Sequence, residues 1–146
     1  MTVTLATLSR RTGLAVLDHL EQAASIPVVD GLQAQGDLIV VPLPVLTGSV
    51  LVRPGAFWRK VPAEGIELLR GAAGGNPHTL VADPGTCLWT TDVADDQRLT
   101  IGAFTATAVA YLLHPEHGAS GCVPGTYVIR RQREHDGPRQ VRFVAD

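Results

Sequence analysis

The sequence predicts a mainly β protein, a single small β-barrel or sandwich with one amphipathic helix near its N-terminus. Short runs of Val, Ile, Leu and Thr recur from residue 36 onward, as strands require. The 15 glycines and 10 prolines stand between these runs as turn residues and form no repeat. Only one segment shows the three- and four-residue apolar spacing of a helix.

The helix is expected over residues 12–24. Its apolar positions share one face: Leu14, Leu17, Leu20 and Ala24. Thr12 or Ser9 supplies a cap at its start, and Pro27 ends it. An amphipathic helix must cover its apolar stripe, so we expect Leu14 and Leu17 to contact either the following domain or a partner protein.

The chain divides into an N-terminal arm and helix over residues 1–34 and a β domain over residues 35–146. Residues 1–9 are expected as a short strand or a loose arm, and residues 27–35 as a linker. Strands are expected at 37–42, 49–53, 66–70, 79–82, 87–91, 98–103, 107–113, 126–132 and 141–144. Pro-Gly, Asp-Pro-Gly and Asp-Gly-Pro turns separate many of them.

Composition bounds the class of protein. With 146 residues the chain fits one ordinary domain, and 45% hydrophobic against 18% charged residues excludes intrinsic disorder. The net charge of -2 gives no reason to expect nucleic acid or an anionic membrane as partner. No apolar run approaches the ~18 residues of a membrane span. Lys60 is the single lysine among 12 basic residues, a bias typical of GC-rich bacterial genomes.

The two cysteines predict structural rather than reactive thiols. Cys87 and Cys122 lie far apart and form no C-x-x-C pair, so we expect two free, packed thiols in a cytoplasmic protein. Neither cysteine has an adjacent base, and the sequence contains no G-x-S-x-G motif. Nucleophilic catalysis therefore has no support.

The segment His114-Pro115-Glu116-His117-Gly118 carries the densest polar chemistry. Imidazole and carboxylate are ordinary ligands of divalent metals, and a metal site here would use His78, His114 and His117, with Glu116 as catalytic base. Pro115 disfavours a helix, so the helical same-face argument does not apply. The alternative is a strand-to-turn segment whose histidines bond backbone carbonyls and whose glutamate is solvated. No cofactor is expected other than such a metal.

Five arginines cluster near the C-terminus: Arg130, Arg131, Arg133, Arg139 and Arg142. With Tyr127, the pair Arg130 and Arg131 could hold a phosphate or carboxylate of a small molecule or nucleotide. The alternative is a strand whose arginines pair with an acidic neighbour such as Asp92, Asp95 or Asp96. Aromatic residues for base stacking are nearly absent, so nucleic-acid binding is not expected.

One loop combines aromatic and basic residues. Phe57 and Trp58 lie directly before Arg59 and Lys60. Such a loop either packs at the end of a strand or forms a contact surface, because interfaces favour tryptophan and arginine. The glycine-rich segment 71–75 lacks the G-K-[ST] ending of a P-loop, which favours a hairpin loop.

Several segments together resemble a family of small, uncharacterised bacterial proteins. They are Gln35-Gly36-Asp37, Asn76-Pro77-His78, His114-Pro115-Glu116-His117-Gly118 and Pro124-Gly125-Thr126-Tyr127 through Arg130-Arg131-Gln132-Arg133-Glu134. The resemblance covers about residues 35–135. Where the family pattern reads G-E-x-x-G-H-x-H, this chain has Ala72 or Ala73 for the glutamate and keeps one histidine, His78. If those residues bind a metal in the family, this chain has lost some of the ligands.

The histidine order is also similar to that of metal-binding jelly rolls of the cupin type. In cupins a final histidine follows the P-x-G turn, whereas here none follows until His135. Cupin-like chemistry thus remains an alternative carried by His78, His114 and His117 alone.

The sequence favours a non-enzymatic β domain that acts through protein contacts or self-assembly, with the helix or the Phe57-Trp58 loop as its apolar surface. A metal-dependent hydrolase or cupin-like enzyme is the first alternative. A small-molecule or nucleotide binder is the second. The expected partner is another protein or a second copy, without nucleic acid or membrane.

Overall fold

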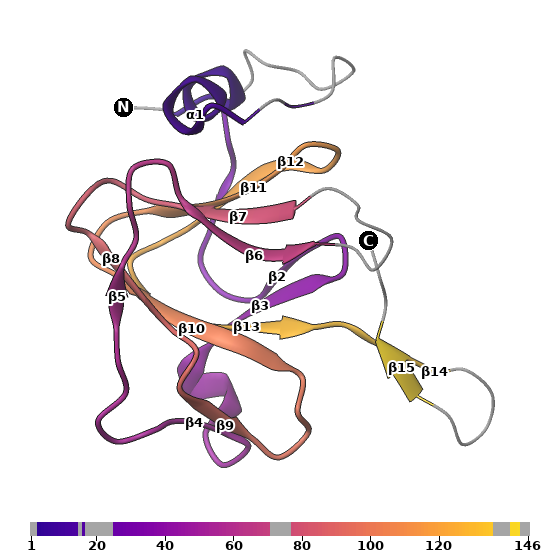
Figure 1. Cartoon of the computed structure of the whole chain (residues 1–146). Coiled ribbons are helices and arrows are strands. Elements are labelled where there is room, and N and C mark those ends of the chain that lie inside the picture. The colour runs from indigo at the N-terminus through magenta and orange to yellow at the C-terminus, as the bar shows by residue number, and fades with distance from the viewer. Residues whose placement is uncertain (1–2, 15, 17–24, 71–76, 136–140, 144–146) are drawn as a thin grey trace.

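Two β-sheets form the body of the protein in its computed structural model (Figure 1). The structure describes residues 3–14, 16, 25–70, 77–135 and 141–143. The chain is mainly β, as predicted, and these residues include one α-helix. The described strands do not close into a barrel.

The first sheet has five strands in the order β1 (Val28–Val29), β12 (Gly118–Cys122), β11 (Ala110–His114), β7 (Pro77–Val81) and β6 (Ile66–Arg70). Its pairs are antiparallel except β1 with β12. The second sheet has six antiparallel strands in the order β2 (Gln33–Gln35), β3 (Leu38–Pro42), β13 (Gly125–Arg131), β10 (Thr100–Ala106), β8 (Cys87–Thr90) and β5 (Arg59–Lys60).

Two ribbons and a short 3₁₀ helix complete the described structure. The ribbons are β4 (Val50–Val52) with β9 (Val93–Asp95), and β14 (Arg133–His135) with β15 (Val141–Phe143). The 3₁₀ helix η1 spans Leu43–Leu46 and connects β3 to β4. Each predicted strand segment overlaps a strand of the structure, whereas β1, β2, β5, β9, β12 and β14 were not predicted.

One hydrophobic core joins the facing sides of the two sheets. Leu80 and Leu112 enter it from the first sheet, and Phe104, Tyr127 and Ile129 enter it from the second. All five side chains are buried, and the rings of Phe104 and Tyr127 stack with centroids 5.1 Å apart. Because strand side chains alternate between faces, residues two positions from these also point between the sheets.

The helix lies earlier in the chain than predicted. Helix α1 spans Leu5–Thr12, and the hydroxyl of Thr4 caps its start by accepting from the N–H of Thr7 at 3.2 Å. Gly13 ends it with a left-handed φ of 71°. The predicted helix over 12–24 is therefore wrong at residues 13, 14 and 16, and its remaining positions, including Leu17, lie outside the described residues. The strand or loose arm predicted over 1–9 is also wrong from residue 5.

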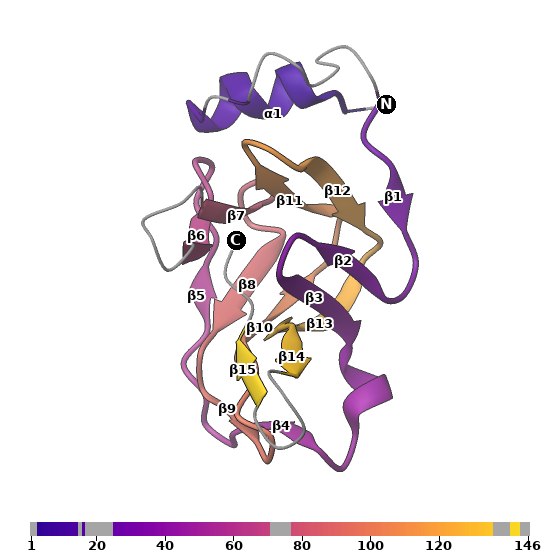
Figure 2. The ribbon, with the colours of Figure 1, turned by 90° about the vertical axis from the view of Figure 1, so that its right-hand side faces the viewer.

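The apolar face of α1 covers the outer side of the first sheet (Figure 2). Leu5 and Leu8 are buried against Val81, Tyr111 and Leu113. Leu14 packs partly buried against the same cluster. The chain's own β domain thus covers the apolar face of α1. Of the predicted stripe, Leu14 packs there, and Leu17, Leu20 and Ala24 lie outside the described residues.

The linker predicted over residues 27–35 is wrong, because it contains strands β1 and β2. Val28 and Val29 pair in parallel with Gly121 and Cys122. Residues 33–35 pair with β3, so the predicted boundary between residues 34 and 35 falls inside β2. Among the described residues no helix has the length and apolar character needed to cross a membrane.

Candidate functional site

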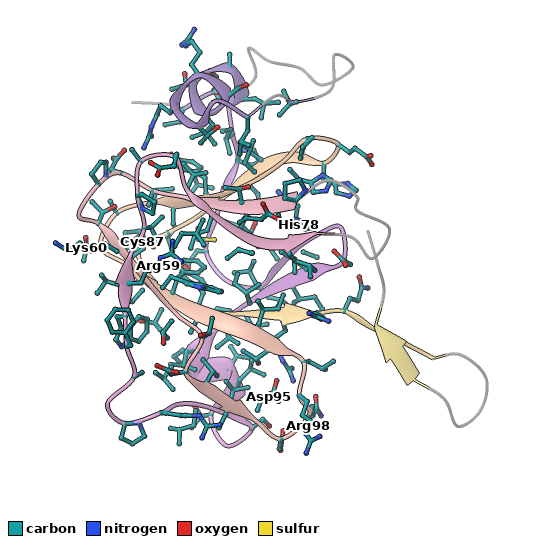
Figure 3. The ribbon with its side chains drawn as sticks, viewed as in Figure 1. Arg59, Lys60, His78, Cys87, Asp95 and Arg98 are labelled. Atoms are coloured by element: carbon teal, nitrogen blue, oxygen red, sulfur yellow. The ribbon has the colours of Figure 1, made fainter. Side chains whose placement is uncertain are left out.

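Three imidazole rings gather at the ends of β7 and β11. His78 lies on β7, His114 ends β11, and His117 lies in the β11–β12 hairpin loop (Figure 3 labels His78). Ring centroids are 4.4 Å apart for His78 and His114, 4.4 Å for His114 and His117, and 6.3 Å for His78 and His117. His78 and His114 are buried, whereas His117 is exposed. The structure therefore places His78 beside the histidine pair, as the sequence suggested.

Both ring nitrogens of His78 contact acceptors from the opposite sheet. Nδ1 lies 2.9 Å from Oε1 of Gln35, and Nε2 lies 3.1 Å from Oδ1 of the buried Asp37. The amide nitrogen of Gln35 donates to the carbonyl of Leu112 at 3.0 Å, which leaves Oε1 as the acceptor and places a proton on Nδ1 of His78. Nε2 forms the second contact of the ring, with the Asp37 carboxyl, so both nitrogens of His78 bind groups of the chain itself.

His114 stabilises its own hairpin turn. Its Nδ1 accepts from the backbone N–H groups of Glu116 at 3.0 Å and His117 at 3.1 Å. Gly118 follows with φ at +82°, a conformation that glycine adopts without strain. Because Nδ1 of His114 accepts these bonds, the proton of the neutral His114 ring lies on Nε2. The strand-to-turn alternative predicted bonds from the histidines to backbone carbonyls, whereas His114 accepts from backbone N–H groups and His78 contacts two side chains.

The proposed metal-site residues are close together, but their donor atoms are largely committed. His78 uses both nitrogens and His114 uses Nδ1 within the chain. In the described part of the chain no group of three or more His, Cys, Asp or Glu side chains is arranged to hold a metal ion. Glu116, the candidate base, is exposed on the hairpin loop.

The predicted ligand residues Tyr127, Arg130 and Arg131 take separate places. Tyr127 is buried, and its hydroxyl donates to the carbonyl of Val123 at 2.7 Å. Arg130 pairs with Asp95 at 3.3 Å, as the alternative of an acidic neighbour predicted. Arg130 and the half-buried Arg131 line an open cavity of about 400 Å³, which Tyr127 does not reach.

The two cysteines are free and buried, as predicted. Both belong to the core between the sheets. Burial raises the pKa of Cys87 to about 12 and, with a smaller contribution from Cys87, that of Cys122 to about 12. Since the thiolate is the reactive form, neither thiol is suited to nucleophilic chemistry at neutral pH.

Asp95 organises the turn between β9 and β10. Its carboxylate accepts from the hydroxyl and N–H of Thr100, from the N–H of Gln97 and from Arg130. Burial raises the pKa of Asp95, but the hydrogen bonds from Thr100 and Gln97 and the charge of Arg130 outweigh it and hold the pKa below its ordinary value. Asp95 is thus ionised and fully engaged.

The aromatic–basic loop is a fixed, exposed surface at the edge of the second sheet. Phe57 is 75% exposed, and its backbone N–H donates to the Asp92 carboxylate at 2.8 Å. Trp58 is half-buried, and residues 59–60 form the exposed edge strand β5 (Figure 3). We call residues 57–60 the Phe57–Lys60 edge.

A larger cavity that the sequence did not predict lies between η1, β4 and β9. It has a volume of about 930 Å³, and Leu43, Leu51, Arg53 and Arg98 are among its lining residues. These residues come from different turns and strands, so no local motif indicates the cavity. The one local signal is the turn Asp95-Asp96-Gln97-Arg98, where a glycine would be expected at the last position.

Comparison with known proteins gives one match. Residues 34–132 match the family model described as Domain of unknown function (DUF8820). The match begins in β2, ends just past β13, and agrees with the span of the resemblance seen in the sequence. The histidine cluster, the larger cavity and the Phe57–Lys60 edge all lie within it. No curated protein and no solved structure matched.

Proposed function

The chain belongs to the DUF8820 family, and we propose that it is a non-enzymatic binding domain that makes protein contacts through the Phe57–Lys60 edge. The exposure of Phe57 carries this proposal. Phe57 is 75% exposed, and the bond from its backbone N–H to Asp92 fixes the loop that carries the ring, so the ring presents apolar area at little backbone conformational cost.

The adjoining strand β5 supports the same contact. It pairs with β8 on one side and stands at the edge of the second sheet, so its other side can accept an extended peptide. Arg59 and Lys60 are exposed on this edge. Charged side chains on an edge strand repel a second copy approaching across a two-fold axis, because like charges would meet. The edge therefore suits an acidic, partly apolar segment of another protein.

The placement of the titratable groups also favours binding over catalysis. His78 and Arg130 are engaged in contacts within the chain, and the two thiols are buried. The enzymatic alternative would use His78, and the nucleotide-binding alternative would use Arg130. A binding role needs none of them.

The proposal is tested with a fluorescein-labelled peptide in which acidic residues alternate with leucine and tryptophan. We expect saturable binding by fluorescence polarisation, and about tenfold weaker binding by Phe57→Ser, since a central aromatic anchor contributes that much or more. Leu32→Ser is the matched control, because Leu32 is 64% exposed elsewhere on the surface. A peptide with lysine in place of the acidic residues should not bind.

Three results would overturn the proposal. The first is equal binding of the acidic and basic peptides, and the second is an equal loss of binding in Phe57→Ser and Leu32→Ser. The third is a dimer, seen by size exclusion with light scattering, that Phe57→Ser converts to monomer. That result would make a second copy the occupant of the edge.

The contacts among three imidazoles favour a second candidate, a divalent-metal site of a hydrolase. It is tested by elemental analysis of protein purified without chelator or histidine tag. Near-stoichiometric metal that is lost in His114→Ala and His117→Ala would support it. Metal-free protein with both variants folded would rule it out.

A further inference from the structure

The cavity between η1, β4 and β9 has the size and lining of a ligand site. Its volume of about 930 Å³ falls in the range of small-molecule pockets, roughly 300–1,000 Å³. The 3₁₀ helix, the β4–β9 ribbon and the turn after β9 border this open cavity, at the end of the molecule where Figure 3 labels Asp95 and Arg98. The Phe57–Lys60 edge does not contribute to its lining.

Two arginines give the cavity its charge. Arg53 follows β4, and Arg98 lies in the turn between β9 and β10. In the described part of the chain no ion pair or hydrogen bond engages either guanidinium group. The acidic residues of the lining do not cancel them fully, because Asp95 is already bonded to Thr100, Gln97 and Arg130, which leaves Asp96.

The backbone of Arg98 points to the same conclusion. Its φ of +56° is the one positive value outside glycine among the described residues. A side chain in the left-handed region is unfavourable, and glycine or asparagine usually occupies such a turn position. An arginine held there against local preference, with its charge beside a cavity, indicates a role outside the fold's own stability.

The rest of the lining is mixed, with the hydroxyls of Thr47, Ser49 and Thr100 beside apolar side chains. Leu43 and Leu51 line the cavity, and Leu51 is 60% exposed although it belongs to a strand. A ligand with an apolar body would cover this leucine, and an anionic head would neutralise the two arginines.

We propose that this cavity binds a small amphipathic anion, a molecule with a carboxylate or phosphate head on an apolar body, with Arg53 and Arg98 holding the head. This site is independent of the Phe57–Lys60 edge. Its failure would leave the protein-contact proposal intact, and the reverse also holds.

The test uses 1-anilinonaphthalene-8-sulfonate, an apolar anion whose fluorescence rises on binding, and N-phenyl-1-naphthylamine, its uncharged analogue. We expect one saturable site for the anion and about tenfold weaker binding in Arg53→Gln and in Arg98→Asn, since each removes a charge-assisted contact. Asparagine tolerates the left-handed conformation, so Arg98→Asn should keep the turn. Arg59→Gln, an exposed arginine outside the cavity, is the matched control.

Displacement then identifies the head group. Decanoate and decyl phosphate should both compete with the fluorescent anion, and the stronger competitor indicates whether the site prefers a carboxylate or a phosphate. Decanol should compete at least tenfold more weakly than either. Equal competition by decanol, equal binding of the uncharged analogue, or equal loss of binding in Arg59→Gln would overturn the proposal. Circular dichroism of each variant checks that the fluorescence does not report unfolding.

Discussion

The histidine cluster and the η1–β4–β9 cavity both concentrate polar side chains, and they use them in different ways. At the cluster, His78 lies between Gln35 and Asp37 and is fully buried, with both nitrogens satisfied by the chain itself. At the cavity, Arg53 and Arg98 border open space and make no ion pair with the described residues. At the cluster the polar groups bind each other across the two sheets, whereas at the cavity the guanidinium groups are available to a ligand.

This difference decides which region is the better candidate for ligand binding. A buried polar network that is satisfied internally fixes the register of the elements it joins and has little left for a ligand. Charged groups that border a cavity without partners gain more from an incoming anion, because no internal contact must be broken first. Density of histidines in the sequence is thus a weaker guide than the partners those side chains find.

The largest effect should come from breaking the network at the cluster. His78→Ala removes two hydrogen bonds and leaves the buried carboxyl of Asp37 without its imidazole partner. We expect the free energy of unfolding to fall by ~3–5 kcal/mol, as for other buried pairs that lose one member. Urea denaturation followed by circular dichroism measures the loss.

His117→Ala is the control for that prediction. His117 belongs to the same cluster of rings but is exposed, so its replacement should cost less than ~1 kcal/mol. Equal losses in the two variants would show that ring contacts, rather than the bonds to Gln35 and Asp37, hold the cluster together. The contrast drawn with the cavity would then fail.

The next effect concerns Asp95. This residue combines features of both regions, because it lines the cavity and its carboxylate is also bonded within the chain. Asp95→Asn should lower the free energy of unfolding at pH 7 by ~1.5–3 kcal/mol, since hydrogen bonds to a charged group are lost. The pKa of Asp95 is lowered in the folded state, so its contribution is present above the ordinary value of 3.8 and is lost as the pH falls through the lower folded value.

The stability of wild type and Asp95→Asn should therefore converge in acid. Urea denaturation at a series of pH values from neutral to strongly acidic checks this. A difference that stays constant across the series would mean that the ionised carboxylate contributes nothing and that the effect of Asn is steric. Asp95 would then add no negative charge to the lining of the cavity.

The strands that the sequence predicted are those whose own residues favour a strand. Leu38–Pro42 and Ile66–Arg70 are rich in branched apolar residues. Strand β12 reads Gly-Ala-Ser-Gly-Cys, which has no such preference, and it forms because the hairpin aligns it with β11. The helix was predicted too late in the chain because the apolar spacing after Gly13 is more regular than that before it, whereas the cap at Thr4 and the stop at Gly13 set the actual bounds.

For the candidate site, the sequence predicted which histidines lie close together but not the side chains that bind them. The proximity of His78 to the histidine pair followed from each lying at the end of a strand. Its partners Gln35 and Asp37 did not, because they lie 43 and 41 positions away and contact it across the two sheets. The cavity was missed for the same reason, since Arg53 and Arg98 belong to separate segments that line one cavity only because β4 pairs with β9.

The smallest effect should be a gain in stability at the cavity. Arg98→Gly relieves a left-handed backbone that costs a side chain ~1–2 kcal/mol, against ~0.5–1 kcal/mol for the greater freedom of glycine in the unfolded chain. We expect a net gain of up to about 1 kcal/mol, seen as a higher Tm by calorimetry, together with weaker binding of 1-anilinonaphthalene-8-sulfonate. Arg53→Ala, whose backbone is not left-handed, should lose binding without the gain in Tm. If Arg98→Gly is instead destabilising, the guanidinium serves the fold as His78 does, and the two regions are alike.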